Sequence, residues 1–213
     1  MFDEDRFHAG EDFFSTYRQL GGKRLGRAAV DVAIRNCYAG MSRDYEDPAH
    51  ADDFPSLAQG LEKYSAVEQV DMPLLEAVFA RHEIGHIPPA YGDCLRRLSR
   101  SHQLGVVSNI WARKAAWLAE FERAGIHHIW RTQVFSSDSR SIKPSHRLFH
   151  AALTDCKATP SDVVFVGDNL RVDIEPASSL GLATVWITAS AEQHPLADRV
   201  VPMLLALETL PAN

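Results

Sequence analysis

The chain has 213 residues, of which 46% are hydrophobic and 23% charged, and its formal net charge is −6. This composition is ordinary for a globular protein and excludes a disordered chain, a collagen-like chain and a coiled-coil rod. At about 150 residues per domain, the length predicts one large domain, or one domain with a sizeable insertion. The acidic excess and the lack of a Lys/Arg block argue against nucleic acid or an anionic membrane as a partner.

Cysteine usage and hydropathy predict where the protein works. Cys37, Cys94 and Cys156 are far apart and form no CxxC pair, which favours reduced thiols in a cytoplasm. No apolar run approaches the roughly 18 residues of a membrane helix. The first residues are acidic and lack an apolar core, so a secretory signal is not expected. We therefore predict a cytoplasmic protein without a membrane span; its oligomeric state is left open.

The first part of the sequence, to about residue 87, has a helical pattern and no convincing strand. The expected helices, in chain order, cover residues 11–20, 25–38, 57–64 and 72–81. Residues 41–54 are polar and acidic, and prolines at positions 48 and 55 punctuate this stretch. They are therefore predicted to form a loop.

After Pro88-Pro89 short apolar runs alternate with helical segments. The expected strands cover residues 104–108, 133–135, 163–166, 183–187 and 199–201, and the expected helices cover 91–101, 112–124, 145–156 and 174–180. Continuous apolar strands at this spacing are typical of a parallel sheet covered by helices on both faces. The predicted fold class is therefore α/β, with a doubly wound parallel sheet.

Polar residues follow three of the predicted strands. Ser108-Asn109 end the first strand, a loop after the second delivers Lys143, and Asp168 follows the third, with Asp173 five residues later. Ligands of such sheets bind beyond the carboxyl ends of the strands. A hydroxyl and an ammonium group suit phosphate oxygens, whereas carboxylates would repel them unless a cation lies between. Mg²⁺ is commonly held by one or two carboxylates plus phosphate oxygens, so these residues predict a Mg²⁺–phosphate site.

These motifs, in this order, resemble the haloacid dehalogenase-like (HAD) hydrolase superfamily. The residues that carry the resemblance are Ser108-Asn109, Lys143-Pro144 and the stretch from Gly167 to Asp173, and Asp3-Glu4-Asp5 resembles the opening motif. The resemblance implies a helical cap over residues 11–87 and an α/β core of residues 1–10 and 88–213.

The resemblance also implies a mechanism. Asp3 would be the nucleophile that forms an aspartyl-phosphate, and Asp5 the general acid and base. Mg²⁺ would be held by Asp3, Asp5 and Asp168, with support from Asp173. Ser108, Asn109 and Lys143 would bind the phosphoryl group of a small phosphorylated metabolite. The implied activity is Mg²⁺-dependent phosphomonoester hydrolysis.

Two further hypotheses keep the fold and change the function. Arg6 and Phe7 depart from the opening motif, and the two residues before Asp3 span at most about 7 Å, too short for a central strand. A catalytically silent or N-terminally clipped HAD-like binding protein is therefore the second hypothesis. The third is a 2-haloacid dehalogenase, which Asp5 disfavours because a halide leaving group needs no acid.

A rival motif lies at the end of the helical part. His82-Glu83-Ile84-Gly85-His86 has the spacing of zinc proteases, whose chemistry requires both histidines on one face of a helix. Gly85 and the prolines at 88 and 89 predict that this helix stops by His86. We therefore interpret His82 and His86 as residues that end a helix, where a positive imidazolium is favoured.

Overall fold

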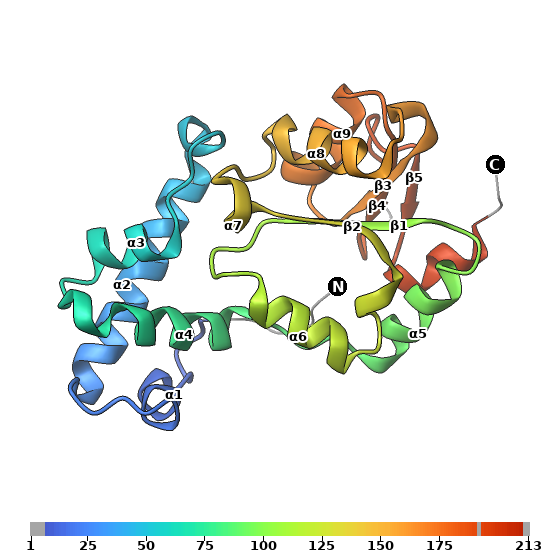
Figure 1. Cartoon of the computed structure of the whole chain (residues 1–213). Coiled ribbons are helices and arrows are strands. Elements are labelled where there is room, and N and C mark those ends of the chain that lie inside the picture. The colour runs from blue at the N-terminus through green and yellow to red at the C-terminus, as the bar shows by residue number, and fades with distance from the viewer. Residues whose placement is uncertain (1–6, 191–192, 211–213) are drawn as a thin grey trace.

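A computed structural model describes residues 7–190 and 193–210 and separates them into a helical region and a strand region (Figure 1). The helices of the helical region are α1 (Phe13–Gln19), α2 (Arg27–Glu46), α3 (Leu57–Tyr64) and α4 (Met72–Glu83). Short 3₁₀ turns at Pro48–His50 and Gln69–Asp71 lie between them. As expected, no described residue of this region is in a strand.

Local signals determine where several of these helices begin and end. The Asp12 side chain accepts the Ser15 N–H at 2.8 Å and caps α1. Ser56 and Gln59 form a reciprocal capping box at the start of α3. The helices bury one continuous apolar core, whose fully buried members include Phe13, Tyr17, Ile34, Met41, Leu61, Leu75 and Phe79.

The predicted loop over residues 41–54 is wrong for its first part, because α2 continues to Glu46. Met41 is fully buried, and Gly60 of α3 approaches it so closely that a Cβ at residue 60 would lie 2.4 Å from the Met41 sulfur. The Asp44 carboxylate accepts a 2.7 Å hydrogen bond from the Tyr64 hydroxyl. Contacts between α2 and α3 thus extend a helix whose polar sequence gave no such signal.

The strand region alternates helices and strands as expected. Its helices are α5 (Pro89–Leu98), α6 (Ala115–Arg123), α7 (Ser136–Ser139), α8 (His146–Cys156) and α9 (Glu175–Ser179). Its strands are β1 (Leu104–Ser108), β2 (Trp130–Phe135), β3 (Val164–Gly167), β4 (Ala183–Ile187) and β5 (Arg199–Val201). In Figure 1, α8 and α9 lie on one side of the strands and α5 and α6 on the other, which is the layering of a doubly wound fold.

All strand pairs are parallel, but the strands form two separate sheets. β1 pairs with β2, and β4 lies between β3 and β5. Among the described residues no strand joins β1 to β3. Val164 at the start of β3 is 53% exposed, which is unusual for a strand of a covered parallel sheet. The two sheets therefore each leave an edge without a strand partner within this part of the chain.

No helix in the described residues is both long and apolar enough to span a membrane.

Candidate functional site

The structure places the described site residues at the carboxyl ends of β1 and β3. Ser108 is the last residue of β1, Asp168 directly follows β3, and Asp173 lies in a π-helical turn over Leu170–Ile174. Lys143 lies in the loop between α7 and α8. Asp3 and Asp5, the predicted nucleophile and acid/base, lie outside the described residues.

Lys143 and Asp173 form a buried ion pair. The Lys143 Nζ lies 2.6 Å from the Asp173 Oδ1, and the two side chains are only 11% and 5% exposed. The second oxygen, Oδ2, accepts the Asn169 N–H at 3.1 Å. A Cβ on Gly167 would lie 2.3 Å from the Asp173 Cβ, so only glycine at residue 167 allows this approach. Removing one partner of such a pair leaves a buried charge and is strongly destabilising.

Asp168 differs from Asp173 in being exposed, and its carboxylate has no partner among the described residues. The Asp168 carbonyl accepts a hydrogen bond from the Trp186 indole N–H at 3.1 Å, which fixes the backbone at this position. An oxygen donor without a protein partner is the ligand type that Mg²⁺ prefers. No group of three metal-ligating side chains occurs within the described residues. Asp168 therefore offers a carboxylate oxygen of the kind that binds Mg²⁺, and the other predicted ligands, Asp3 and Asp5, lie outside the described residues.

The side chains of the neighbouring residues Ser108 and Asn109 differ in their hydrogen bonds. The Asn109 amide donates to the Lys143 carbonyl and to the Tyr45 hydroxyl, both at 3.0 Å, and its oxygen accepts the Lys143 N–H at 2.7 Å. Both N–H groups of this amide are therefore engaged with protein atoms. The Ser108 hydroxyl has no hydrogen-bond partner in the described part of the chain. Direct substrate binding by either residue stays a prediction, but Ser108 has the free hydroxyl.

Tyr45 and Glu83 also belong to this network, and the sequence did not single them out as site residues. Burial raises the pKa of the Tyr45 phenol above its ordinary value, so this hydroxyl stays protonated at neutral pH. The Glu83 carboxylate accepts the N–H groups of Trp111 at 2.6 Å and Ala112 at 2.9 Å, just after Asn109. Glu83 had one signal, its place in the HExxH motif; Tyr45 had none, because it fell in the predicted loop.

The two histidines of the HExxH motif face different partners. The His82 ring contacts the Glu11 carboxylate and the Thr16 hydroxyl, the latter at 2.8 Å. The His86 Nδ1 lies 3.7 Å from the Glu120 carboxylate. The interpretation that both end the helix is wrong for His86, because α4 ends at Glu83. The motif therefore lacks the continuous helix that zinc-protease chemistry needs.

A family model described as haloacid dehalogenase-like hydrolase matches residues 12–181. This match covers most of the chain, which therefore belongs to the HAD-like hydrolases.

Individual relatives are more distant. The chain is 30% identical over 135 residues to the glyceraldehyde 3-phosphate phosphatase of Methanopyrus kandleri, a match that covers 59% of this chain and 56% of that protein. It thus spans little more than half the length of this curated relative.

Solved structures share the fold. A 2-haloacid dehalogenase from Pseudomonas syringae pv. Tomato DC3000 has a TM-score of 0.64 and 20% identity, covering 97% of this chain and 94% of that one. A HAD phosphatase from Thermococcus onnurineus has a TM-score of 0.58 and 18% identity, covering 93% and 85%. A HAD-hydrolase from Bacillus subtilis, bound to magnesium, has a TM-score of 0.57 and 16% identity, covering 93% and 92%.

Proposed function

We propose that this protein is a Mg²⁺-dependent phosphomonoester hydrolase that acts on a small phosphorylated metabolite. The observation that carries the proposal is the buried Lys143–Asp173 pair at the sheet edge where the side-chain oxygens of Asp168 and Ser108 have no hydrogen-bond partner among the described residues. A cation, a hydroxyl and a free carboxylate together suit a phosphoryl group and a metal ion. The name of the Methanopyrus kandleri relative, a phosphatase of a phosphorylated three-carbon aldehyde, supports a small substrate of this kind.

Each residue has a defined part in the proposed reaction. The Lys143 ammonium and the Ser108 hydroxyl bind phosphoryl oxygens and offset their charge. Asp173 holds Lys143 in place. Asp3, the Asp5 carbonyl and Asp168 would hold Mg²⁺, with Asp173 supporting them. When bound, the ion would supply positive charge to the transferring phosphoryl group.

The proposed reaction has two steps. A carboxylate oxygen of Asp3 attacks phosphorus while the ester P–O bond breaks, and Asp5 gives its proton to the departing alcohol. Asp5 then takes a proton from water, which attacks the aspartyl-phosphate and releases inorganic phosphate and free Asp3. Residues 11–87 form the proposed cap, which excludes bulk water during both steps.

The proposal is tested by hydrolysis of an aryl phosphate by the full chain, with Mg²⁺ and with a chelator. We expect turnover only with Mg²⁺, and its loss in Asp3→Asn and Asp168→Asn. Lys143→Met is expected to lower kcat by about 10²–10³-fold, the usual effect of removing one preorganised charge-stabilising group. Asp93→Asn and Lys114→Met serve as matched controls, because both side chains lie in exposed ion pairs on other elements. Chelator-resistant turnover, or full activity in Asp3→Asn, would contradict the proposal.

A silent HAD-like binding protein is the second candidate, and one observation favours it. Arg6 and Phe7 stand where the opening motif of the family has other residue types. A Mg²⁺-dependent rise in melting temperature without turnover would support this candidate, because ligands that bind the native state stabilise it.

A further inference from the structure

Residues 45–54, which we call the latch segment, join the helical region to the loops at the sheet edge. The segment runs from the last turn of α2, through the turn at Pro48–His50, to Phe54 before α3 (Figure 1). The Tyr45 hydroxyl contacts the Asn109 amide after β1. The Arg171 guanidinium, after β3, donates a hydrogen bond to the Glu46 carboxylate at 2.9 Å. Further contacts join the segment to Trp111, through the rings of Tyr45 and Phe54, and to residues 140–147, the loop that carries Lys143.

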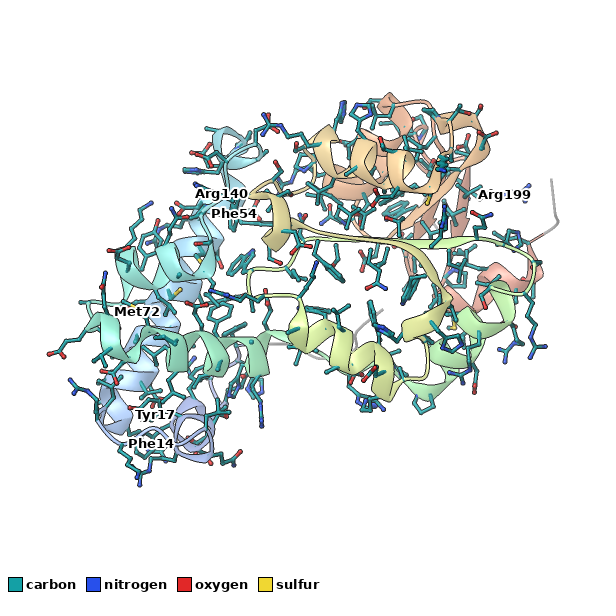
Figure 2. All side chains as sticks on the ribbon, viewed as in Figure 1. Phe14, Tyr17, Phe54, Met72, Arg140 and Arg199 are labelled. Carbon is teal, nitrogen blue, oxygen red and sulfur yellow. The ribbon has the colours of Figure 1, made fainter. Side chains whose placement is uncertain are left out.

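Two backbone hydrogen bonds join the latch segment to this loop before Lys143. The Phe54 N–H donates to the Arg140 carbonyl at 2.7 Å, and Figure 2 shows these two residues next to each other. The Ile142 N–H donates to the Ala51 carbonyl at 2.9 Å. The backbone that leads into Lys143 is therefore held to the latch segment by two backbone hydrogen bonds.

Asp52 holds the loop on the other side of Lys143. The Ser145 hydroxyl donates to the Asp52 carboxylate at 2.5 Å, and the Arg147 guanidinium donates to the Asp52 carbonyl at 3.0 Å. Ser145 is buried, and its Oγ also accepts the Arg147 N–H at 3.3 Å, so movement of Asp52 would leave the hydroxyl hydrogen of Ser145 without its acceptor. Contacts on both sides thus leave the Lys143 backbone little freedom.

Tyr45 acts on Lys143 itself through Asn109. Its hydroxyl accepts one Asn109 N–H, while the rest of that amide bonds to the backbone N–H and carbonyl of Lys143. The Tyr45 ring packs edge-on against Phe54, with ring centroids 6.1 Å apart at 90°. Loss of this hydroxyl would free one amide N–H and let Asn109 rotate away from the Lys143 backbone.

We propose that Tyr45 and Asp52 are positioning residues, and that the latch segment holds Lys143 in register with Asp173. The proposal rests on the function proposed above, in which Lys143 binds the phosphoryl group. It adds that the lysine is correctly placed only while the helical region is docked on the sheet edge. Movement of the helical region away from this edge would release the Lys143 loop together with the substrate-binding charge.

The experiment measures how well Lys143 is protected, which requires no turnover. The full-length protein is trace-labelled with acetic anhydride, and mass spectrometry gives the labelling of Lys143 relative to the exposed Lys23. Tyr45→Phe and Asp52→Ala are expected to raise this ratio several-fold. Tyr91→Phe and Asp93→Ala are the matched controls: both residues lie on α5, outside the latch segment and the Lys143 loop, and Asp93 makes an exposed ion pair with Arg96. Both controls are expected to leave the ratio unchanged.

Kinetics and a second variant distinguish positioning from general loosening. If the protein hydrolyses phosphate esters, Tyr45→Phe should lower kcat by about tenfold or more, the scale expected for slight misplacement of a catalytic group. Ser145→Ala removes the Asp52 contact from the other side together with the cap on the Arg147 N–H, so it should raise labelling at least as much as Asp52→Ala, and the double variant should fall short of the sum of the two.

Unchanged Lys143 labelling in both latch variants would overturn the proposal, as would an equal rise in the controls. Absence of hydrolysis in the unsubstituted protein would instead count against the proposed function alone, since the labelling result would still stand.

Discussion

The helical region and the strand region bury their apolar side chains to different extents. The helices share one core in which Phe13, Ile34 and Phe79 are fully inaccessible. The strands lie over two smaller clusters, and Val164 on β3 is half exposed. The site residues Ser108 and Asp168 lie on this less completely covered side of the molecule. The difference teaches that the helical region is held together by one large core, to which Ala112 and Ile142 of the strand region also belong, whereas the sheet edge depends on contacts that reach it from the helical region.

The largest expected effect tests this difference directly. Phe79→Ala removes a ring from the closed helical core and should lower the free energy of unfolding by about 3–5 kcal/mol. Val164→Ala removes two methyl groups from a half-exposed strand position and should cost less than about 1 kcal/mol. Chemical denaturation of both variants is the measurement. Equal losses of unfolding free energy would contradict the difference in burial between the two regions.

The second prediction concerns the close approach of β3 to the π-helical turn. Gly167→Ala places a methyl group against Asp173 and should destabilise the fold by up to about 3 kcal/mol through overpacking. Gly26→Ala is the control, because nothing lies within 4 Å of its added Cβ; as a helix-cap change it should cost no more than about 1 kcal/mol. The measurement is the denaturant midpoint of each variant. Equal midpoints would show that Asp173 can move aside without loss of stability.

The third prediction concerns Glu83, which links the helical region to the loop after β1. Glu83→Gln keeps one acceptor for the N–H groups of Trp111 and Ala112 but sets an NH₂ group against the other. We expect a loss of about 1–2 kcal/mol from the unsatisfied N–H. Glu76→Gln on the same helix is the control, because its partner Arg113 is 87% exposed and such pairs contribute little. The measurement is the thermal unfolding midpoint of each variant. Equal midpoints would contradict the role assigned to Glu83.

The smallest expected effect is a difference in cysteine reactivity. Burial raises the pKa of Cys37 in the helical core to about 12, so hardly any thiolate is present at pH 8. Cys156 at the end of α8 is only partly buried, and burial raises its pKa as well. Iodoacetamide should therefore alkylate Cys156 before Cys37 in the native protein, and both at the same rate in guanidinium chloride. Native Cys37 that reacts as fast as Cys156 would contradict a closed helical core.

Sequence patterns predicted the elements of both regions better than the contacts between them. The five strands and the helical texture before residue 88 were expected from apolar runs and periodicity, and all five strands are present. The last turn of α2 was missed because it is polar and is stabilised by Tyr64 of α3, and α7 and the first half of β2 were not predicted either. The order of the motifs also identified the HAD-like family, which the match over residues 12–181 shows.

The sequence by itself determined which polar groups follow the strands. It could do so because the end of a strand and the type of residue after it are local properties of the chain. Ser108, Lys143, Asp168 and Asp173 were all named in this way. Only the tertiary structure decided how they are used: it pairs Lys143 with Asp173 and leaves the Asp168 carboxylate exposed, without a partner in the part of the chain that is described. It also brought Tyr45 against Asn109 from a segment predicted as loop. Such contacts join residues 64 positions apart, and no local pattern encodes them because their energy comes from burial and hydrogen bonds that exist only after folding.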